Sequence, residues 1–339
     1  MRFLITGGAG FIGSHLIQAL VAQGHRPMIV DDLSTGSLEN LSDLPKESYD
    51  LIQGSILDDR LIRDVASRAE RIFHLAAAVG VRYIIERPLQ TLTTNVEGTA
   101  VVLRAAAERK IPILLTSTSE VYGKNPAAPL REDDDSVTGA AHLGRWSYAC
   151  TKALDEFLAL AYWRERGLPA VVVRLFNTVG PRQSGRYGMV VPRFVAAALA
   201  GEPLEVHGDG RQTRTFCDVE DAVRGMLLLI ESEAARGEIF NLGGTEEISI
   251  EALARRIVAA TKSASPVRLV PYEEAFPRDF EDMRRRVPDI GKARRVVGYV
   301  PRYGLDAILD RVIAHHRGKL GLSGREASVL PFRQGGAAG

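Results

Sequence analysis

The sequence has few cysteines, no long apolar segment and no excess of charge of either sign. Cys150 and Cys217 are the two cysteines among 339 residues, which excludes a disulfide framework and gives no zinc-site spacing. Lysine and arginine number 43 against 42 aspartates and glutamates, so no broad positive field attracts nucleic acid. No apolar run approaches the roughly 20 residues of a membrane span. We expect a soluble protein whose partners are small molecules, without metal, nucleic acid or membrane.

Short β-rich segments alternate with helical patterns over the first half of the chain. Strands are predicted at residues 2–6, 27–32, 71–77, 112–119 and 170–176, and helices up to 22 and at 92–110 and 148–166. This order is typical of an α/β fold with a doubly wound parallel sheet. A strand beginning at Arg2 leaves no room for a signal peptide, and together with the scarce cysteines this favours the cytoplasm.

The later part of the chain predicts a second, smaller unit. We expect a Rossmann-like domain over residues 1–180 that also receives segments from about 205–245. Residues 181–318 are expected to form mainly a smaller α/β substrate lobe, with a helix at 192–200. The remainder, 319–339, is rich in glycine, alanine and polar residues and is predicted to be a flexible tail.

A glycine-rich turn follows the first predicted strand and leads into a helix. Its sequence is GGAGFIG, and the residues predicted to face a ligand are Gly7, Gly10, Phe11, Ile12 and Gly13. Glycines without Cβ atoms let backbone N–H groups and a helix N-terminus approach a pyrophosphate. A glycine turn without a ligand is the alternative, but the strand before it and the helix after it favour a dinucleotide.

Two acidic residues follow the second predicted strand. Asp31 and Asp32 stand about 20 residues beyond the glycine turn, where a carboxylate accepts the ribose hydroxyls of adenosine and repels a 2′-phosphate. The pattern therefore predicts NAD rather than NADP. Asp31, the first after the strand, is the preferred ligand, and a capped turn is the alternative.

Tyr148 and Lys152 form the strongest catalytic pattern in the chain. They lie four positions apart in SYACTK, so on a helix they project from the same face. A nearby ammonium stabilises a phenolate, and we expect it to lower the tyrosine pKa from about 10 toward neutrality, so that Tyr148 can remove a proton from a hydroxyl. The spacing alone is common, but the Rossmann motif and the hydroxyl-rich TSTSEVYG strengthen it.

From GGAGFIG to about Pro301 the chain resembles the extended short-chain dehydrogenase/reductase superfamily, in its NAD-dependent epimerase/dehydratase branch. The resemblance implies Tyr148 as the base, Lys152 as its support at the nicotinamide ribose, and Thr118 as a partner of the sugar C4 hydroxyl. It implies a UDP-sugar substrate and a homodimer built from the two helices at 92–110 and 148–166. It adds Leu75, Ala76, Ala77 and Asn95 on the cofactor side. On the substrate side it adds Arg82, Asn177, Arg182, Arg193, Arg214 and Arg286.

Finer motifs favour decarboxylation. RWSYACTKALDE, GRQTRTF and FEDMRRRVPD resemble UDP-glucuronate decarboxylases, including UDP-apiose/UDP-xylose synthases and the aminoarabinose-pathway enzyme. Glu120 matches a glutamate of that group, whereas Ser119 replaces the aspartate usual in 4,6-dehydratases. Oxidation at C4 of UDP-glucuronate would leave a β-keto acid that loses carbon dioxide, with Arg214, Ser119 and Glu120 at the reacting carbons. The cycle is redox-neutral, so NAD is expected to stay bound and the product to be a UDP-pentose.

Other reactions remain open. GVRYIIERP, which contains Arg82, resembles UDP-glucuronate 4-epimerases, so a UDP-sugar 4-epimerase is the main alternative. Ring contraction to an apiose sugar is a variant of decarboxylation, and 4,6-dehydration is less favoured. A purely regulatory Rossmann protein would keep the glycine turn but lose Tyr148 or Lys152. His315 and His316 are not predicted to form a metal site, because no ligand partners accompany them.

Overall fold

The computed structural model describes residues 1–79, 87–185, 188–275, 281 and 283–321. Its centre is a seven-stranded sheet with the order β11-β6-β5-β4-β1-β2-β3, in which every pair of neighbours is parallel. The strands are β1 (Phe3–Thr6), β2 (Met28–Asp31), β3 (Asp50–Gln53), β4 (Arg71–His74), β5 (Ile113–Thr118), β6 (Ala170–Leu175) and β11 (Ile239–Leu242). The strand order reverses between β1 and β4, which opens a crevice at their carboxyl ends. The predicted α/β fold class is confirmed.

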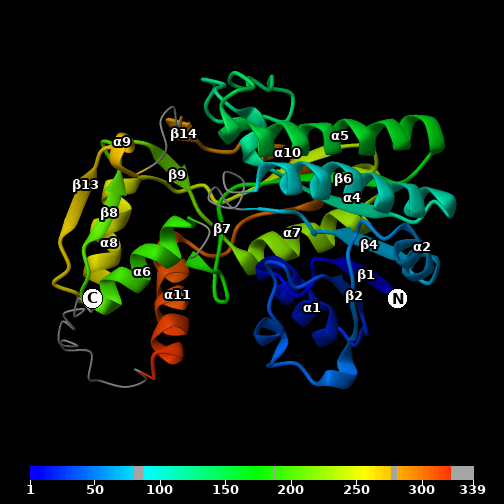
Figure 1. The fold of residues 1–339 in the computed structure, drawn as a ribbon, viewed down its shortest axis with the longest axis horizontal. Helices are drawn as coiled ribbons and strands as arrows, with labels where there is room; N and C mark the ends of the chain where they lie inside the picture. The colour runs from blue at the N-terminus through cyan, green and yellow to red at the C-terminus, as the bar shows by residue number, and fades with distance from the viewer. Residues whose placement is uncertain (80–86, 186–187, 276–280, 282, 322–339) are drawn as a thin grey trace, which may run out of the picture.

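Helices cover both faces of the sheet (Figure 1). One face carries α1 (Phe11–Ala22) and α7 (Val219–Glu231), and the other carries α2 (Asp59–Ser67), α4 (Pro88–Glu108) and α5 (Ser147–Arg166). Successive strand residues point to opposite faces, so Ile5 packs in one core and Leu4 in the other. Burial on both sides explains why these strands read as continuous apolar runs.

The helices that carry the predicted catalytic and dimer residues begin earlier than the sequence pattern indicates. α4 begins at Pro88, whose fixed φ and missing N–H suit the first turn of a helix. α5 ends at Arg166, and Gly167 caps it in the left-handed conformation with a φ of 65°. Among the described residues, no helix is both long enough and apolar enough to cross a membrane.

A smaller lobe stands beside the sheet domain (Figure 1). Its core is formed by α6 (Val190–Ala200), α8 (Ile250–Thr261) and α11 (Leu305–Lys319), which share one apolar cluster. Two small sheets complete it, one of β8 (Leu204–His207) with β13 (Val267–Val270), the other of β12 (Glu247–Ser249), β9 (Thr213–Thr215) and β14 (Arg285–Arg286).

The chain passes between the two parts more than once. β7 (Thr178–Val179) pairs with β10 (Cys217–Asp218) at their junction, and α7 and β11 then return to the sheet domain. β8 and β9 lie in the smaller lobe, although they fall at the start of the segment that we expected to rejoin the Rossmann domain. α10 (Gly291–Val297) packs on β11 and α7, back on the sheet domain.

A buried ion pair attaches α5 to the sheet. Arg174 of β6 donates from Nη2 to Glu156 Oε2 of α5 at 2.8 Å and from Nε to Oε1 at 3.0 Å, and both side chains are only 6% exposed. The Ser117 hydroxyl of β5 donates to the same carboxylate. The Arg174 guanidinium also lies 4.6 Å from the ring centroid of Tyr122. These contacts leave no charge of the pair unsatisfied.

Arg174→Met should destabilise the fold by about 3–5 kcal/mol, because it leaves the Glu156 carboxylate buried without its partner. Urea unfolding measures this loss. Arg26→Met is the control, since its ion pair with Asp50 is exposed and is worth less than about 1 kcal/mol. Equal losses in the two variants would show that the Glu156–Arg174 pair does not hold the fold.

Candidate active site

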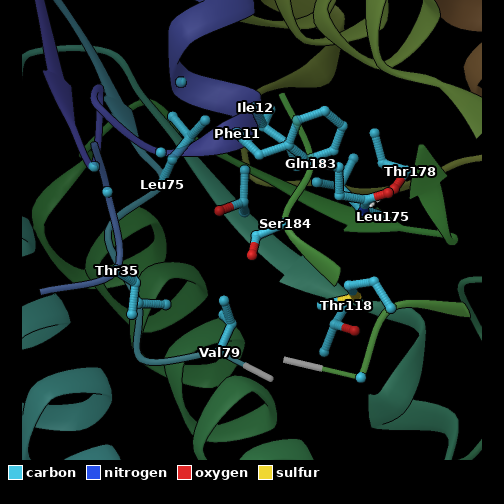
Figure 2. Close-up of a pocket in the computed structure, with 18 of the residues that line it drawn as sticks. Phe11, Ile12, Thr35, Leu75, Val79, Thr118, Leu175, Thr178, Gln183 and Ser184 are labelled. Atoms are coloured by element: carbon cyan, nitrogen blue, oxygen red, sulfur yellow. Dashed lines mark hydrogen bonds between the residues drawn. The ribbon is translucent and has the colours of Figure 1, made fainter. Parts of the chain in front are cut away.

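A cavity of about 1090 Å³ lies between the sheet domain and the smaller lobe, and both contribute to its wall. Figure 2 shows Phe11 and Ile12 of α1, Leu75 beyond β4, and Gln183 and Ser184 beyond β7 around it. Most residues expected from the sequence line this one cavity: Gly7, Gly10, Phe11, Ile12, Gly13, Asp31, Asp32, Leu75, Ala76, Ala77, Thr118, Ser119, Glu120, Tyr148, Lys152, Asn177, Arg182, Arg193, Arg214 and Arg286. Arg82 lies outside the described residues.

The glycine turn has no space for side chains. A Cβ on Gly7 would lie 2.7 Å from the Ala76 nitrogen, and Gly7 has a φ of +73°. A Cβ on Gly13 would lie 2.3 Å from the Gly7 carbonyl oxygen. Gly10 precedes α1 without a capping side chain, which leaves the first N–H groups of the helix for a ligand. This cradle fits the pyrophosphate of a dinucleotide.

Asp31 is held firmly at the end of β2. Its Oδ2 accepts a hydrogen bond from the Ala9 backbone N–H, and its Oδ1 accepts one from Leu33, both at 2.8 Å. Burial raises the pKa of this carboxyl, and the two backbone hydrogen bonds oppose that rise. Each oxygen keeps further acceptor capacity for a ribose hydroxyl. Asp32 is exposed and instead accepts hydrogen bonds from Ser34.

The predicted catalytic pair, Tyr148 and Lys152, lies in the first turns of α5 and lines the cavity together with the end of β5. Burial raises the pKa of Tyr148, and the negative charges of Glu120 and Asp155 raise it further. The expectation of a tyrosine pKa near neutrality is therefore wrong for the protein alone. Burial is the main reason, and Asp155 adds to it, because its Oδ2 lies 3.0 Å from Lys152 Nζ in a buried ion pair that offsets the charge of the ammonium.

Arg286 of β14 joins two other predicted site residues. Its Nη1 donates to Glu120 Oε1 and its Nη2 donates to Asn177 Oδ1. Asn177 in turn donates from Nδ2 to the Thr215 carbonyl at 2.7 Å. The resemblance implied a substrate-side role for Arg286, and its guanidinium is engaged beside Glu120, on the wall that also holds Tyr148. β5, β14 and the turn after β6 thus converge at one point of the cavity.

Arg214 and Arg193 belong to the lobe side of the cavity. Arg214 of β9 is buried, lies in register with Arg286 of β14, and donates from Nη1 to the Thr213 carbonyl at 2.8 Å. Arg193 of α6 is bonded to His207 Nε2 at 2.9 Å. Burial and the neighbouring Arg193 lower the pKa of His207 to about 4, so the imidazole is neutral and accepts this hydrogen bond.

Arg182 and Asn95 both make hydrogen bonds to other parts of the Rossmann domain. Arg182 donates from Nη1 to the Asn40 carbonyl at 3.1 Å and from Nη2 to Gln18 Oε1, which engages it with segments of the Rossmann domain. Asn95 does not line the cavity. Its Oδ1 accepts from the Ala78 N–H at 2.8 Å and it is fully buried, so it braces the loop that follows β4.

Residues of α11 also line the cavity, and sequence reasoning missed them. His315, His316 and Lys319 lie at the end of this helix. The pattern predicted no role for the histidines because their neighbours in space come from far along the chain. Within the described part of the chain, no group of three or more His, Cys, Asp or Glu side chains is arranged to hold a metal ion.

Comparisons with known proteins show which family the chain belongs to. The family model described as GDP-mannose 4,6 dehydratase matches residues 4–312. The chain is 41% identical over 317 residues to a UDP-N-acetyl-alpha-D-glucosaminuronate decarboxylase of Bacillus cytotoxicus, covering 93% of this chain and 98% of that protein. It is 35% identical over 321 residues to UDP-glucuronic acid decarboxylase 1 of Xenopus tropicalis, covering 94% and 73%.

Solved structures share the fold. A UDP-glucose 4-epimerase of Thermotoga maritima with UDP-glucose superposes with a TM-score of 0.86 at 30% identity, covering 94% of this chain and 100% of that one. A UDP-glucuronic acid 4-epimerase of Bacillus cereus, in complex with UDP-glucuronic acid and NAD, gives 0.84 at 27% identity with the same coverage. The chain therefore belongs to the NAD-dependent epimerase/dehydratase family and is a UDP-sugar decarboxylase-like enzyme of the short-chain dehydrogenase/reductase type.

Proposed function

We propose that this protein decarboxylates a UDP-linked uronic acid and thereby forms a UDP-pentose-type product. The observation that carries the proposal is the Arg286–Glu120 ion pair beside Tyr148 and Lys152. An acid–base group and a guanidinium meet there, close to the residues that would act on C4. UDP-glucuronate is the substrate predicted from the sequence, and the 41% identity to the N-acetylglucosaminuronate enzyme makes the N-acetylated uronic acid a second candidate.

The proposed chemistry needs oxidation at C4 before carbon dioxide can leave. Bound NAD would supply the hydride acceptor, held by the glycine turn and Asp31. Tyr148 removes the proton of the C4 hydroxyl, and Thr118 holds that hydroxyl in place. For this step Lys152 has to share its charge between Asp155 and the tyrosine, because the phenolate forms only with a nearby cation. Redox neutrality requires the hydride to return to C4 at the end of the cycle.

The second half of the proposed reaction takes place at C5, the carbon next to C4. A ketone at C4 is β to the C5 carboxylate, so loss of carbon dioxide leaves an enolate. The positive charge of the Arg286 guanidinium stabilises this negative charge, while its two Nη groups stay bonded to Glu120 and Asn177, an arrangement that lysine cannot reproduce. Glu120, with Ser119 beside it, takes up a proton from solvent and delivers it to C5, where it replaces the carboxylate that leaves as carbon dioxide. Arg214 lines the same cavity and contributes a further positive charge for the substrate.

A UDP-sugar 4-epimerase is the alternative, and the superposition on 4-epimerase structures favours it. An epimerase uses the same oxidation by Tyr148, after which the 4-ketose turns over and is reduced on its other face. Such a reaction needs no acid–base group at C5. The Glu120–Arg286 pair is therefore the feature that favours decarboxylation.

Incubation of the purified protein with UDP-glucuronate and, separately, with UDP-N-acetylglucosaminuronate should give a product that has lost carbon dioxide in at least one case. Mass spectrometry and proton NMR identify it. Tyr148→Phe should lower the rate by about 10²–10⁴-fold, the usual contribution of a general base, whereas Tyr162→Phe on the same helix should not. A C4 epimer of unchanged mass would overturn the decarboxylase proposal.

Glu120→Gln should separate the two halves of the reaction. We expect C4 oxidation to continue, so that NADH absorbance accumulates, while decarboxylated product falls by about 10²–10⁴-fold. Arg286→Lys should lose product similarly, because one ammonium cannot bridge both Glu120 and Asn177. Glu165→Gln, at an exposed position of α5, is the control. Normal product formation by Glu120→Gln would exclude Glu120 from the C5 step.

We also propose that the protein is a homodimer that pairs α4 and α5 of two chains. The two helices pack together and leave apolar side chains uncovered, with Leu89 76% and Phe157 73% exposed. Leu92 and Leu154 add to the same two helices. Apolar side chains gathered in this way are typical of an interface rather than of a solvated surface.

Phe157→Asp should convert the dimer to a monomer, because it places a charge in an apolar interface. Sedimentation velocity measures the change. Leu228→Asp on α7, where the native side chain is 38% exposed, is the matched control and should leave the dimer intact. A wild-type protein that sediments as a monomer would contradict the proposal.

A further inference from the structure

The turn after β7 is attached to the helix that carries the glycine turn. Burial lowers the pKa of His15 in α1 to about 4, so its imidazole is neutral. Its Nε2 lies 3.0 Å from the Pro181 carbonyl oxygen, to which a neutral imidazole can donate. The next residue, Arg182, reaches Gln18 of the same helix and the carbonyl of Asn40. This turn therefore connects α1 with the segment that follows β2.

The end of α11 closes the same region from the smaller lobe. The backbone N–H of Arg182 donates to His315 Nε2 at 3.1 Å. One turn further along α11, Lys319 Nζ lies 3.0 Å from Glu39 Oε1. The first turns of α11 are packed in the lobe core through Leu305 and Ile308, so its far end is a rigid extension of the lobe. These contacts join the lobe to the loop beyond β2.

The joined residues lie at one end of the cavity. Glu39, Asn40, Arg182, His315 and Lys319 all line it. Glu39 and Asn40 follow Asp31 along the chain, and a carboxylate at the end of the second strand marks the adenosine ribose of a dinucleotide. The contacts therefore surround the adenosine end, away from the Glu120–Arg286 pair at the sugar end.

We infer that Arg182, His315 and the Glu39–Lys319 ion pair form a clasp that retains the dinucleotide, and that Arg182 serves the cofactor rather than the substrate. The inference rests on the proposed function in one respect, namely that NAD is the resident cofactor. A redox-neutral cycle gains from such a clasp, because NADH that escaped before returning its hydride would leave the sugar oxidised. Dissociation of the dinucleotide requires the turn after β7 and the end of α11 to separate from the Rossmann domain.

Exchange of bound NAD for isotopically labelled NAD, followed by mass spectrometry of the protein-bound nucleotide, tests the clasp without turnover. Arg182→Ala should speed the exchange roughly tenfold or more, since it removes two charged-donor hydrogen bonds. Its KM for the UDP-sugar should stay unchanged. Arg26→Ala is the control, because it removes an exposed ion pair with Asp50 that is not part of the proposed clasp. If Arg182→Ala exchanged NAD at the wild-type rate and had a raised KM for the UDP-sugar, the inference would be overturned. Arg182 would then be assigned to substrate binding.

Swapping the two charges of the Glu39–Lys319 ion pair tests this contact independently of Arg182. Glu39→Lys and Lys319→Glu should each speed NAD exchange by less than about fivefold, because each places like charges together in an exposed pair, and the double variant should restore the slow rate. Single variants that exchange NAD as slowly as wild type, or a double variant that stays as fast as the single variants, would exclude the ion pair from the clasp. Because no sugar is consumed in these measurements, they are independent of whether the product is a decarboxylated sugar or an epimer.

Discussion

The buried ion pair between Glu156 and Arg174 is the contact on which the catalytic geometry depends. It fixes α5 to β6, while Ser117 of β5 donates to the same carboxylate. On α5, Tyr148 stands about two turns and Lys152 about one turn before this anchor, while Thr118 ends β5 and Glu120 follows it. A shift of α5 along the sheet would separate the base from the hydroxyl that it is proposed to deprotonate, so a rigid anchor is required.

The second constraint is the way in which charges are paired around the cavity. Lys152 is neutralised by Asp155, and Glu120 is paired with Arg286. Buried charges need partners in a dry site. Ligands that bring their own charges, a dinucleotide and a nucleotide sugar, compete for these partners. Burial, together with the negative charges of Glu120 and Asp155, raises the pKa of Tyr148 in this arrangement.

The two parts of the chain contribute different halves of the proposed reaction. The Rossmann domain carries the glycine turn, Asp31 and the catalytic pair, which suit oxidation at C4. The smaller lobe carries Arg214 and Arg286, which line the cavity, and α11, which reaches back to Arg182 and Glu39. The lobe contributes residues to both ends of the cavity. Its position relative to the sheet would therefore affect both the proposed reaction at the sugar and the retention of the cofactor.

Local patterns in the sequence were sufficient to predict the Rossmann sheet. They also predicted that the glycine turn, Asp31 and the Tyr148/Lys152 pair lie at one cavity. Each rests on short-range geometry: a strand, a turn without Cβ atoms, or a four-residue helical spacing. The sequence could not show that Asp155 neutralises Lys152, that Arg182 turns toward Gln18 and Asn40, or that Arg286 meets Glu120. Arg182 and Arg286 are hydrogen-bonded to residues more than 100 positions away in the sequence. The Asp155 carboxylate offsets the charge of Lys152 because the two side chains are buried together. Such contacts depend on how the lobe packs against the sheet, which only the tertiary structure decides.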